Sequence, residues 1–135
     1  MSDILSQMNR KIILFAAVLG ILAIILGAFG AHALKSQLTE NQLTTFETGV
    51  RYQMYHAIFL LFLGTTSLVT EKSKKIILSL VLVGVLLFSG SIFLLATPAV
   101  TSVDFGFLGP VTPIGGLLLI VAWGVLFFDI YKQKA

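Results

Sequence analysis

Three stretches of the sequence are apolar over bilayer length, and they constrain the fold more than any other feature. Residues 12–31 and 76–96 contain no charged residue, and residues 114–131 carry only Asp129, close to their end. A transmembrane helix needs about 20 predominantly apolar residues. The chain is 57% hydrophobic and only 11% charged, whereas soluble domains are about 25% charged. The sequence therefore predicts an integral membrane protein.

A fourth apolar run, residues 57–69, is too short to cross a bilayer by itself. Its helix must begin near residue 50, which brings the polar segment RYQMYH, residues 51–56, into the outer membrane layer. We predict one all-α domain over residues 1–135, an antiparallel up-down four-helix bundle with spans at 12–33, 50–70, 76–96 and 113–131. An amphipathic outer helix over residues 40–50, with a capping box of Thr39 and Gln42, continues into the second span.

The basic residues predict the direction of the spans. Two of the nine Lys and Arg residues, Lys35 and Arg51, lie on one side. The other seven lie on the opposite side: Arg10, Lys11, Lys72, Lys74, Lys75, Lys132 and Lys134. Because cytoplasmic loops carry the excess of basic residues, both termini are predicted to be cytoplasmic.

Small residues recur along the first span at steps of three or four. They are Ala16, Gly20, Ala23, Gly27 and Ala31. Inside lipid, helices associate through close packing and polar contacts, so a stripe of small residues lets a neighbouring backbone approach. We predict that this stripe is a helix-packing face.

The polar residues of the spans are expected to gather in the outward half of the bundle. The histidines are at positions 32 and 56, at neighbouring helix ends. Intramembrane ionisable residues are functional candidates by default. The predicted pocket comprises His32, Glu47, Arg51, Tyr52, Gln53, Tyr55, His56, Ser89, Ser91, Thr112, Gly115 and Gly116.

Several of these side chains also have a purely structural explanation. Arg51 could neutralise Glu47 one helical turn earlier and extend to lipid phosphates. Tyr52 and Tyr55 suit the aromatic belt of a membrane interface. The histidines could hydrogen-bond backbone or tyrosine groups across helices. These explanations stay open beside a ligand pocket.

Four ordered segments resemble a known family: GAFGAHAL, TFETGVRYQMYHA, FSGSIFLLA and GPVTPIGGLLLIVAW. They are similar to the small multi-pass membrane proteins grouped as domain of unknown function 423, an uncharacterised UPF family. The resemblance covers nearly the whole chain and implies a bacterial plasma-membrane protein with four helices and no established activity. The family positions it implies are Gly27, Gly30, His32, Arg51, Tyr52, Gln53, His56, Ser89, Gly90, Pro113, Gly115 and Gly116.

Three classes of function stay open. The favoured one is a binding or accessory protein whose pocket takes a lipid headgroup, a small ligand or a partner's membrane helix. A transporter or channel is the alternative, although no span carries a charged residue at mid-membrane. A haem-binding redox protein or an intramembrane enzyme would use His32 and His56.

The composition narrows the chemistry further. The chain has no cysteine, which excludes thiolate metal sites, and it has no basic stripe for nucleic acid. We assign no catalytic residue, no metal site and no cofactor, with haem left open. The lipid bilayer is the expected partner, and homo-oligomerisation is left open.

Overall fold

The computed structural model describes residues 5–134, and no strand occurs in this part of the chain. The elements in chain order are α1 (Gln7–His32), α2 (Glu40–Thr65), α3 (Glu71–Ala96), the short α4 (Pro98–Thr101), the 3-10 helix η1 (Gly106–Leu108) and α5 (Val111–Lys132). The predicted all-α class is confirmed.

Hydroxyl side chains cap the first three long helices. Ser6 accepts a hydrogen bond from the Asn9 amide at the start of α1, and Thr70 accepts one from the Ser73 amide at the start of α3. The predicted capping box at α2 is confirmed: the Gln42 amide donates to the Thr39 hydroxyl, and the Thr39 amide donates to the Gln42 side chain. The amphipathic segment and the apolar run after it form one helix.

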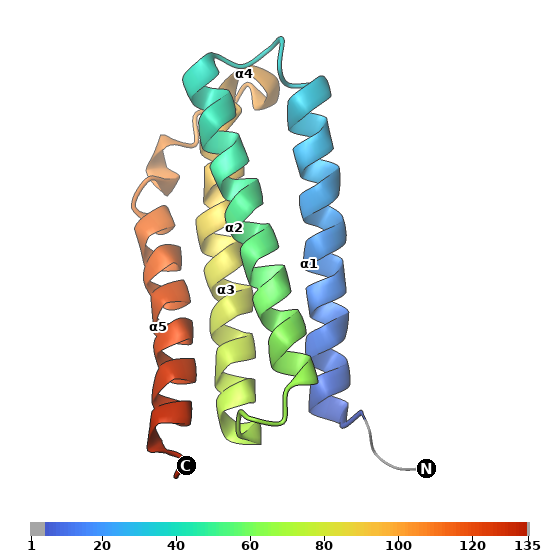
Figure 1. The fold of residues 1–135 in the computed structure, drawn as a ribbon. Coiled ribbons are helices and arrows are strands. Elements are labelled where there is room, and N and C mark those ends of the chain that lie inside the picture. Colours follow the sequence, from blue (N-terminus) through green and yellow to red (C-terminus); the bar gives the residue numbers. More distant parts are fainter. Residues whose placement is uncertain (1–4, 135) are drawn as a thin grey trace.

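The four long helices run side by side, with α2 and α3 at the centre and α1 and α5 on the two sides (Figure 1). The main packing partners are α1 with α2, α2 with α3, and α3 with α5. Consecutive long helices alternate in direction, so α1 begins at the same end of the molecule at which α5 ends. We call this end of the molecule the N/C end. The other end, which holds α4, is called the opposite end.

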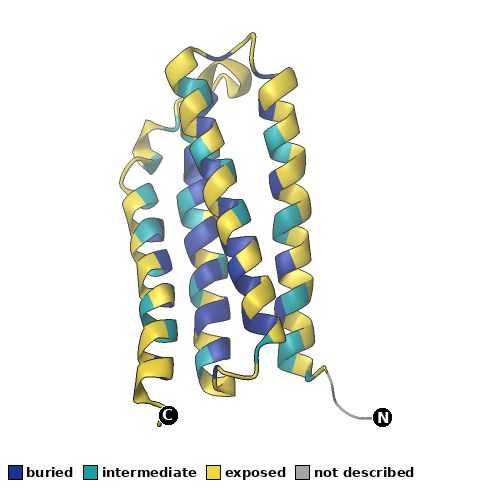
Figure 2. Ribbon diagram, in the orientation of Figure 1, coloured by how far each residue is buried: buried dark blue, intermediate teal, exposed yellow. Residues whose placement is uncertain are grey.

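Three segments are long and apolar enough to cross a membrane: α1, α3 and residues 106–132, which contain α5. The helix α2 is absent from this set because its first half is polar. The central position of α2 shields its polar side chains, because α2 and α3 hold most of the buried positions, whereas α1 and α5 are largely exposed (Figure 2). Exposed large apolar side chains on α1 and α5 are suited to lipid rather than water.

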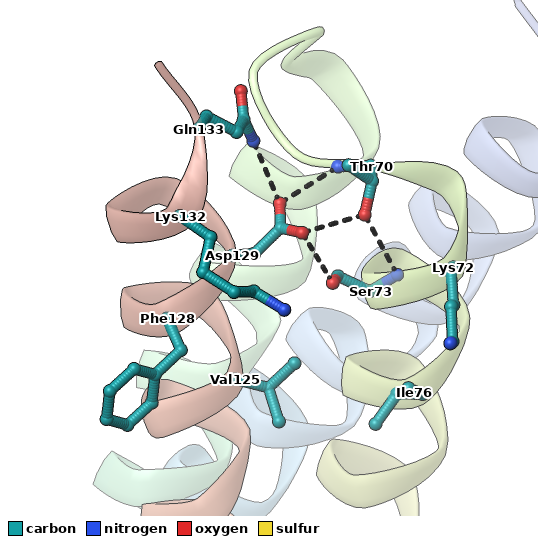
Figure 3. A pocket seen from close by; sticks show the side chains of 9 residues that line it. All are labelled: Thr70, Lys72, Ser73, Ile76, Val125, Phe128, Asp129, Lys132 and Gln133. Carbon is teal, nitrogen blue, oxygen red and sulfur yellow. Dashed lines mark hydrogen bonds between the residues drawn. The ribbon is translucent and has the colours of Figure 1, made fainter. Parts of the chain in front are cut away.

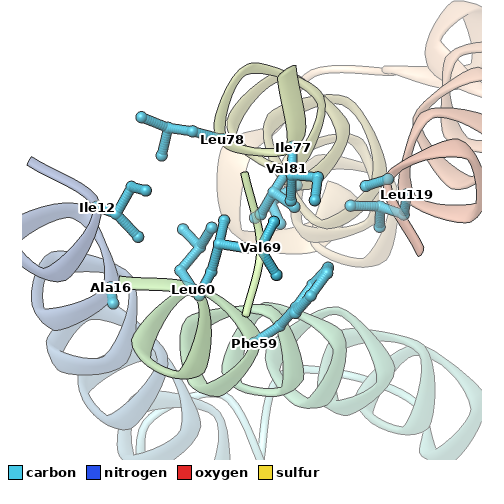
Figure 4. Close-up of a cluster of buried hydrophobic side chains, with 12 residues drawn as sticks. Ile12, Ala16, Phe59, Leu60, Val69, Ile77, Leu78, Val81 and Leu119 are labelled. Atoms are coloured by element: carbon cyan, nitrogen blue, oxygen red, sulfur yellow. The ribbon is translucent and has the colours of Figure 1, made fainter. Parts of the chain in front are cut away.

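The hydrophobic core is built mainly near the N/C end, where side chains from all four long helices meet (Figure 4). Ile12, Leu60, Ile77 and Val81 are fully buried there. A smaller cluster around Phe46 lies near the opposite end.

The predicted small-residue stripe of α1 lies against α2, except at its last position. Ala16 and Ala23 are buried. A Cβ atom on Gly20 would lie 3.9 Å from Ala57 Cβ, and a Cβ atom on Gly27 would lie 3.4 Å from Val50 Cγ1. Ala31 is exposed, which corrects the prediction. Gly30 takes its place against the Phe46 ring. A step of three from position 27 keeps the contact face aligned, because a 3.5-residue repeat alternates steps of four and three.

Candidate functional site

His56 is buried between three helices and uses both ring nitrogens. Its Nδ1 lies 2.7 Å from the Tyr52 carbonyl oxygen on α2, and the Trp123 indole of α5 donates to its Nε2 over 3.1 Å. A carbonyl only accepts and an indole N–H only donates. The hydrogen must therefore sit on Nδ1 and the lone pair on Nε2, so His56 is a neutral imidazole that joins α2 to α5.

His56 lies deeper than the outer layer in which the sequence had suggested it. Its chain neighbour Ala57 packs against Gly20, which is near the middle of the apolar run 12–31. The depth of α2 is fixed by its contacts with α1, because Gly64, near the end of α2, packs against Ile13 at the start of the same run. His56 is consequently near the centre of the span.

The predicted convergence of the two histidines does not occur. His32 is exposed at the end of α1. Its position is a dozen residues beyond Gly20, which corresponds to about 18 Å along the helix axis at 1.5 Å per residue. A single ligand held by both histidines does not match this separation.

A groove of about 330 Å³, the His56 groove, opens beside the buried imidazole. It is lined by Tyr52, His56, Phe88, Gly116, Leu119, Ile120 and Trp123. The Trp123 ring is 48% exposed and stacks on Phe59, with centroids 4.0 Å apart and planes at 13°. Because the imidazole nitrogens and the indole N–H already have partners, the groove presents apolar and aromatic walls to an occupant.

Three other predicted pocket residues lie on the outside of the helix bundle. Glu47, Arg51 and Tyr55 are exposed. The Arg51 guanidinium donates to the Thr48 hydroxyl over 3.2 Å, in the direction of the helix start. This direction is compatible with snorkelling, in which a long basic side chain keeps its charged end in water. Tyr55 lies edge-on to Tyr52, on the outside of α2.

The remaining predicted residues fasten helices together in pairs. Gln53 donates to the Leu19 carbonyl of α1 over 3.0 Å, and Ser89 donates to the Gly49 carbonyl of α2 over 2.7 Å. Ser91 and Thr112 share a hydrogen bond between α3 and α5. Within residues 5–134, no buried side-chain polar atom lacks a partner. These groups are therefore satisfied where they lie and do not line one common polar cavity.

Gly115 and Gly116 have different roles. A Cβ atom on Gly115 would lie 2.4 Å from the Phe88 backbone nitrogen, so the backbones of α5 and α3 approach closely at this glycine. Gly116, one position on, forms part of the groove wall.

A dense polar network lies at the N/C end, contrary to the expectation that such groups gather at the outward side. Lys74 is buried and donates to the Asn9 side chain over 2.8 Å and to the Thr66 carbonyl over 2.6 Å. Asp129 of α5, 7% exposed, accepts from the start of α3 (Figure 3). This network ties both ends of the described chain to the connection between α2 and α3.

Sequence reasoning missed Trp123 and Asp129 as interacting residues. Each lies in an apolar run, where Asp129 was read only as the end of a span. An isolated indole N–H or carboxylate among apolar residues needs a partner. This requirement could have indicated that Trp123 and Asp129 have partners. It could not identify them, because His56 is 67 positions from Trp123 and Thr70 is 59 positions from Asp129.

Comparison with known proteins places the chain in a family. The family model described as "Protein of unknown function (DUF423)" matches residues 26–116. A UPF0382 membrane protein of Haemophilus influenzae is 35% identical over 95% of this chain and 99% of its own length. This chain belongs to the DUF423 family.

Further DUF423 relatives come from other bacteria. The UPF0382 membrane protein SH2409 of Staphylococcus haemolyticus is 36% identical over 91% of this chain and 97% of its own length. The UPF0382 membrane protein YwdK of Bacillus subtilis is 34% identical over 84% and 90%. No solved structure matches. The predicted resemblance is confirmed, and this DUF423 chain is a helical membrane protein.

Proposed function

We propose that this DUF423 protein crosses the bacterial plasma membrane four times, with both termini in the cytoplasm. We further propose that it is a non-enzymatic binding protein that holds a lipid hydrocarbon chain in the His56 groove. Seven of its nine basic residues lie at the N/C end, which supports the orientation. The central place of α2 supports a fourth crossing, since its polar side chains Gln53 and His56 are buried.

The chemistry of the His56 groove carries the choice of ligand. Its one buried ionisable side chain has both nitrogens in hydrogen bonds, so the imidazole is not available to a polar ligand, and the Tyr52 hydroxyl is the one other hydrogen-bonding side-chain group of the lining besides the paired indole. Its walls are the rings of Tyr52, Phe88 and Trp123 and the side chains of Leu119 and Ile120. Inside the membrane such walls favour an apolar occupant through close packing, and the surrounding bilayer supplies hydrocarbon chains at this depth. No feature of residues 5–134 supports an enzyme or transport function as directly as the lining of this groove supports binding.

Trp123 provides the experiment, because it is the only tryptophan. The protein is reconstituted in phosphatidylcholine with a rising fraction of the same lipid brominated near the chain end, a contact quencher of indole fluorescence. Because the two lipids compete equally for the groove, one bound chain gives quenching that rises linearly with the brominated fraction, whereas random contact with several neighbouring chains gives a steeper, curved rise. A Phe127→Trp, Trp123→Phe double variant supplies the random-contact standard, because Phe127 is 60% exposed on α5.

Filling the groove should abolish the difference in quenching between Trp123 and the Phe127→Trp standard. A Cβ atom on Gly116 would meet Phe88 at an ordinary 3.5 Å, so Gly116→Leu keeps the backbone and extends into the groove. Its quenching curve should become that of the Phe127→Trp standard. Gly124→Leu is the matched control, since a Cβ atom there meets nothing within 4 Å. Random-contact quenching of Trp123 in the unmodified protein would contradict the proposal.

A further inference from the structure

The structure contains a second pocket, at the N/C end between α3 and α5 (Figure 3). We propose that this pocket binds the phosphate headgroup of an anionic membrane lipid. Its volume is about 680 Å³, and the polar part of its lining consists of Thr70, Lys72, Ser73, Asp129, Lys132 and Gln133. The site is separate from the His56 groove and uses none of its residues.

The carboxylate in this pocket is fully occupied by the protein itself. Asp129 accepts from the Thr70 backbone amide over 3.0 Å, the Thr70 hydroxyl over 2.8 Å, the Ser73 hydroxyl over 2.7 Å and the Gln133 side-chain amide over 3.1 Å. None of these four donors is a lysine. The negative charge of Asp129 is therefore placed against the start of α3, where the free amides and the helix dipole stabilise it.

Two ammonium groups remain for a ligand. Lys132 extends from α5 toward α3, and Lys72 lies on the α3 side of the same pocket (Figure 3). Both residues are exposed, so both side chains can reorient. Two lysines from different helices can approach the oxygens of one phosphate, as in the basic pockets between transmembrane helices that bind lipid headgroups.

The other part of the lining favours a lipid over a soluble phosphate. Ile76, Val125 and Phe128 complete the pocket. Ile76 and Val125 each lie about one turn farther into the apolar run of their helix than Ser73 and Asp129, and Phe128 lies one turn before Lys132. The pocket is thus charged at the end of the spans and apolar on the side of the bilayer centre. A headgroup at the membrane surface with its chains directed inward matches both parts.

Native mass spectrometry of the full chain in mild detergent tests the site. Phosphatidylglycerol and phosphatidylcholine with identical chains are offered at equal concentration, and we expect retention of phosphatidylglycerol. Lys72→Gln with Lys132→Gln should weaken its binding about 30-fold, taking about 1 kcal/mol per lysine. Unchanged Trp123 emission verifies that this variant is folded.

Arg10→Gln with Lys11→Gln is the matched control. It removes the same charge from the same end of the molecule, on α1 rather than on α3 and α5, and should leave the retention of phosphatidylglycerol unchanged. Equal loss in both double variants would show general attraction to a basic surface and overturn the site. Equal retention of phosphatidylcholine, or displacement of the lipid by millimolar inorganic phosphate, would overturn the anionic-lipid assignment.

Discussion

At the scale of single residues, buried polar side chains in this protein are neutralised by partners rather than gathered for chemistry. His56 is 4% exposed and has one partner per nitrogen. An unsatisfied polar group in an apolar environment costs several kcal/mol, so these bonds make it possible to bury His56 among apolar side chains. They also couple α2 to α5, which have few other close backbone contacts.

We predict that His56→Phe weakens the attachment of α5. The ring keeps its size but loses both hydrogen bonds, and an interhelical bond in a membrane contributes about 0.6 to 1.7 kcal/mol. The free energy of unfolding in mixed micelles should fall by that amount, and Trp123 emission should shift because the indole loses its acceptor. Tyr55→Phe, on the exposed side of α2, should change neither quantity.

Asp129 allows a second residue-scale prediction. In Asp129→Asn the amide nitrogen replaces an acceptor, so at least one of the four donors, three at the start of α3 and one on Gln133, loses its partner. We expect a loss of about 1 to 3 kcal/mol, the usual range for an unmade buried hydrogen bond. Asp104→Asn serves as a control, because Asp104 is exposed and accepts only a local bond from Gly106. Equal thermal stability of the two variants would refute this account of Asp129.

At the scale of helices, α3 and α5 pack through a close crossing of glycines. A Cβ atom on Gly115 would lie 2.4 Å from the Phe88 nitrogen and 2.9 Å from the Gly84 carbonyl oxygen. Both neighbours are backbone atoms, so no side-chain rotation can relieve the contact. The two helices would have to separate.

Gly115→Ala should therefore be among the most damaging small substitutions in the chain. We expect a loss of several kcal/mol, in the range of severe overpacking or beyond it, measured by denaturation in detergent. Gly124→Ala, on the same helix with open space at its Cβ, should be neutral or slightly stabilising because alanine favours helix. Comparable melting temperatures would show that the crossing is less close than described.

The helices themselves could be predicted from the sequence because their causes are local. Apolar length, the Thr39 and Gln42 cap and the small residues of α1 act over a few positions. The site could not be predicted as well, because it depends on depth and rotation. The depth of His56 follows from the contacts that Gly20 and Gly64 make between α1 and α2. The direction in which its side chain points depends on packing against Trp123 of α5, a helix that is distant in sequence.

At the scale of the whole molecule, the arrangement places the most polar long helix between more apolar ones. The outer helices α1 and α5 expose large side chains such as Ile24, Ile120 and Phe127. The two ends also differ: the connection between α2 and α3 is short and fixed by Lys74, while the connection before α5 contains α4 and η1 and is largely exposed.

The proposed topology predicts which end is reached from outside the cell. The chain has no cysteine, so single cysteines can be introduced without background. Gln37→Cys, exposed in the connection between α1 and α2, should react with a membrane-impermeant maleimide on intact cells. Lys75→Cys, exposed near the start of α3, should react only after the cells are opened. The reverse pattern would invert the orientation, and labelling of both sites would remove the crossing by α2.

The hydrogen bond between His56 and Trp123 has a consequence for biosynthesis. Ribosomes deliver the chain from the amino terminus, so α2 reaches the translocon before the residue that satisfies its imidazole has been made. Until α5 arrives, Nε2 of His56 can only meet water or another chain, and α2 alone is poorly suited to remain in lipid. In the four-crossing topology proposed above, completion of the last helix is then what commits the second helix to the bilayer, and we expect a nascent chain that stops short of α5 to leave the polar side of α2 exposed.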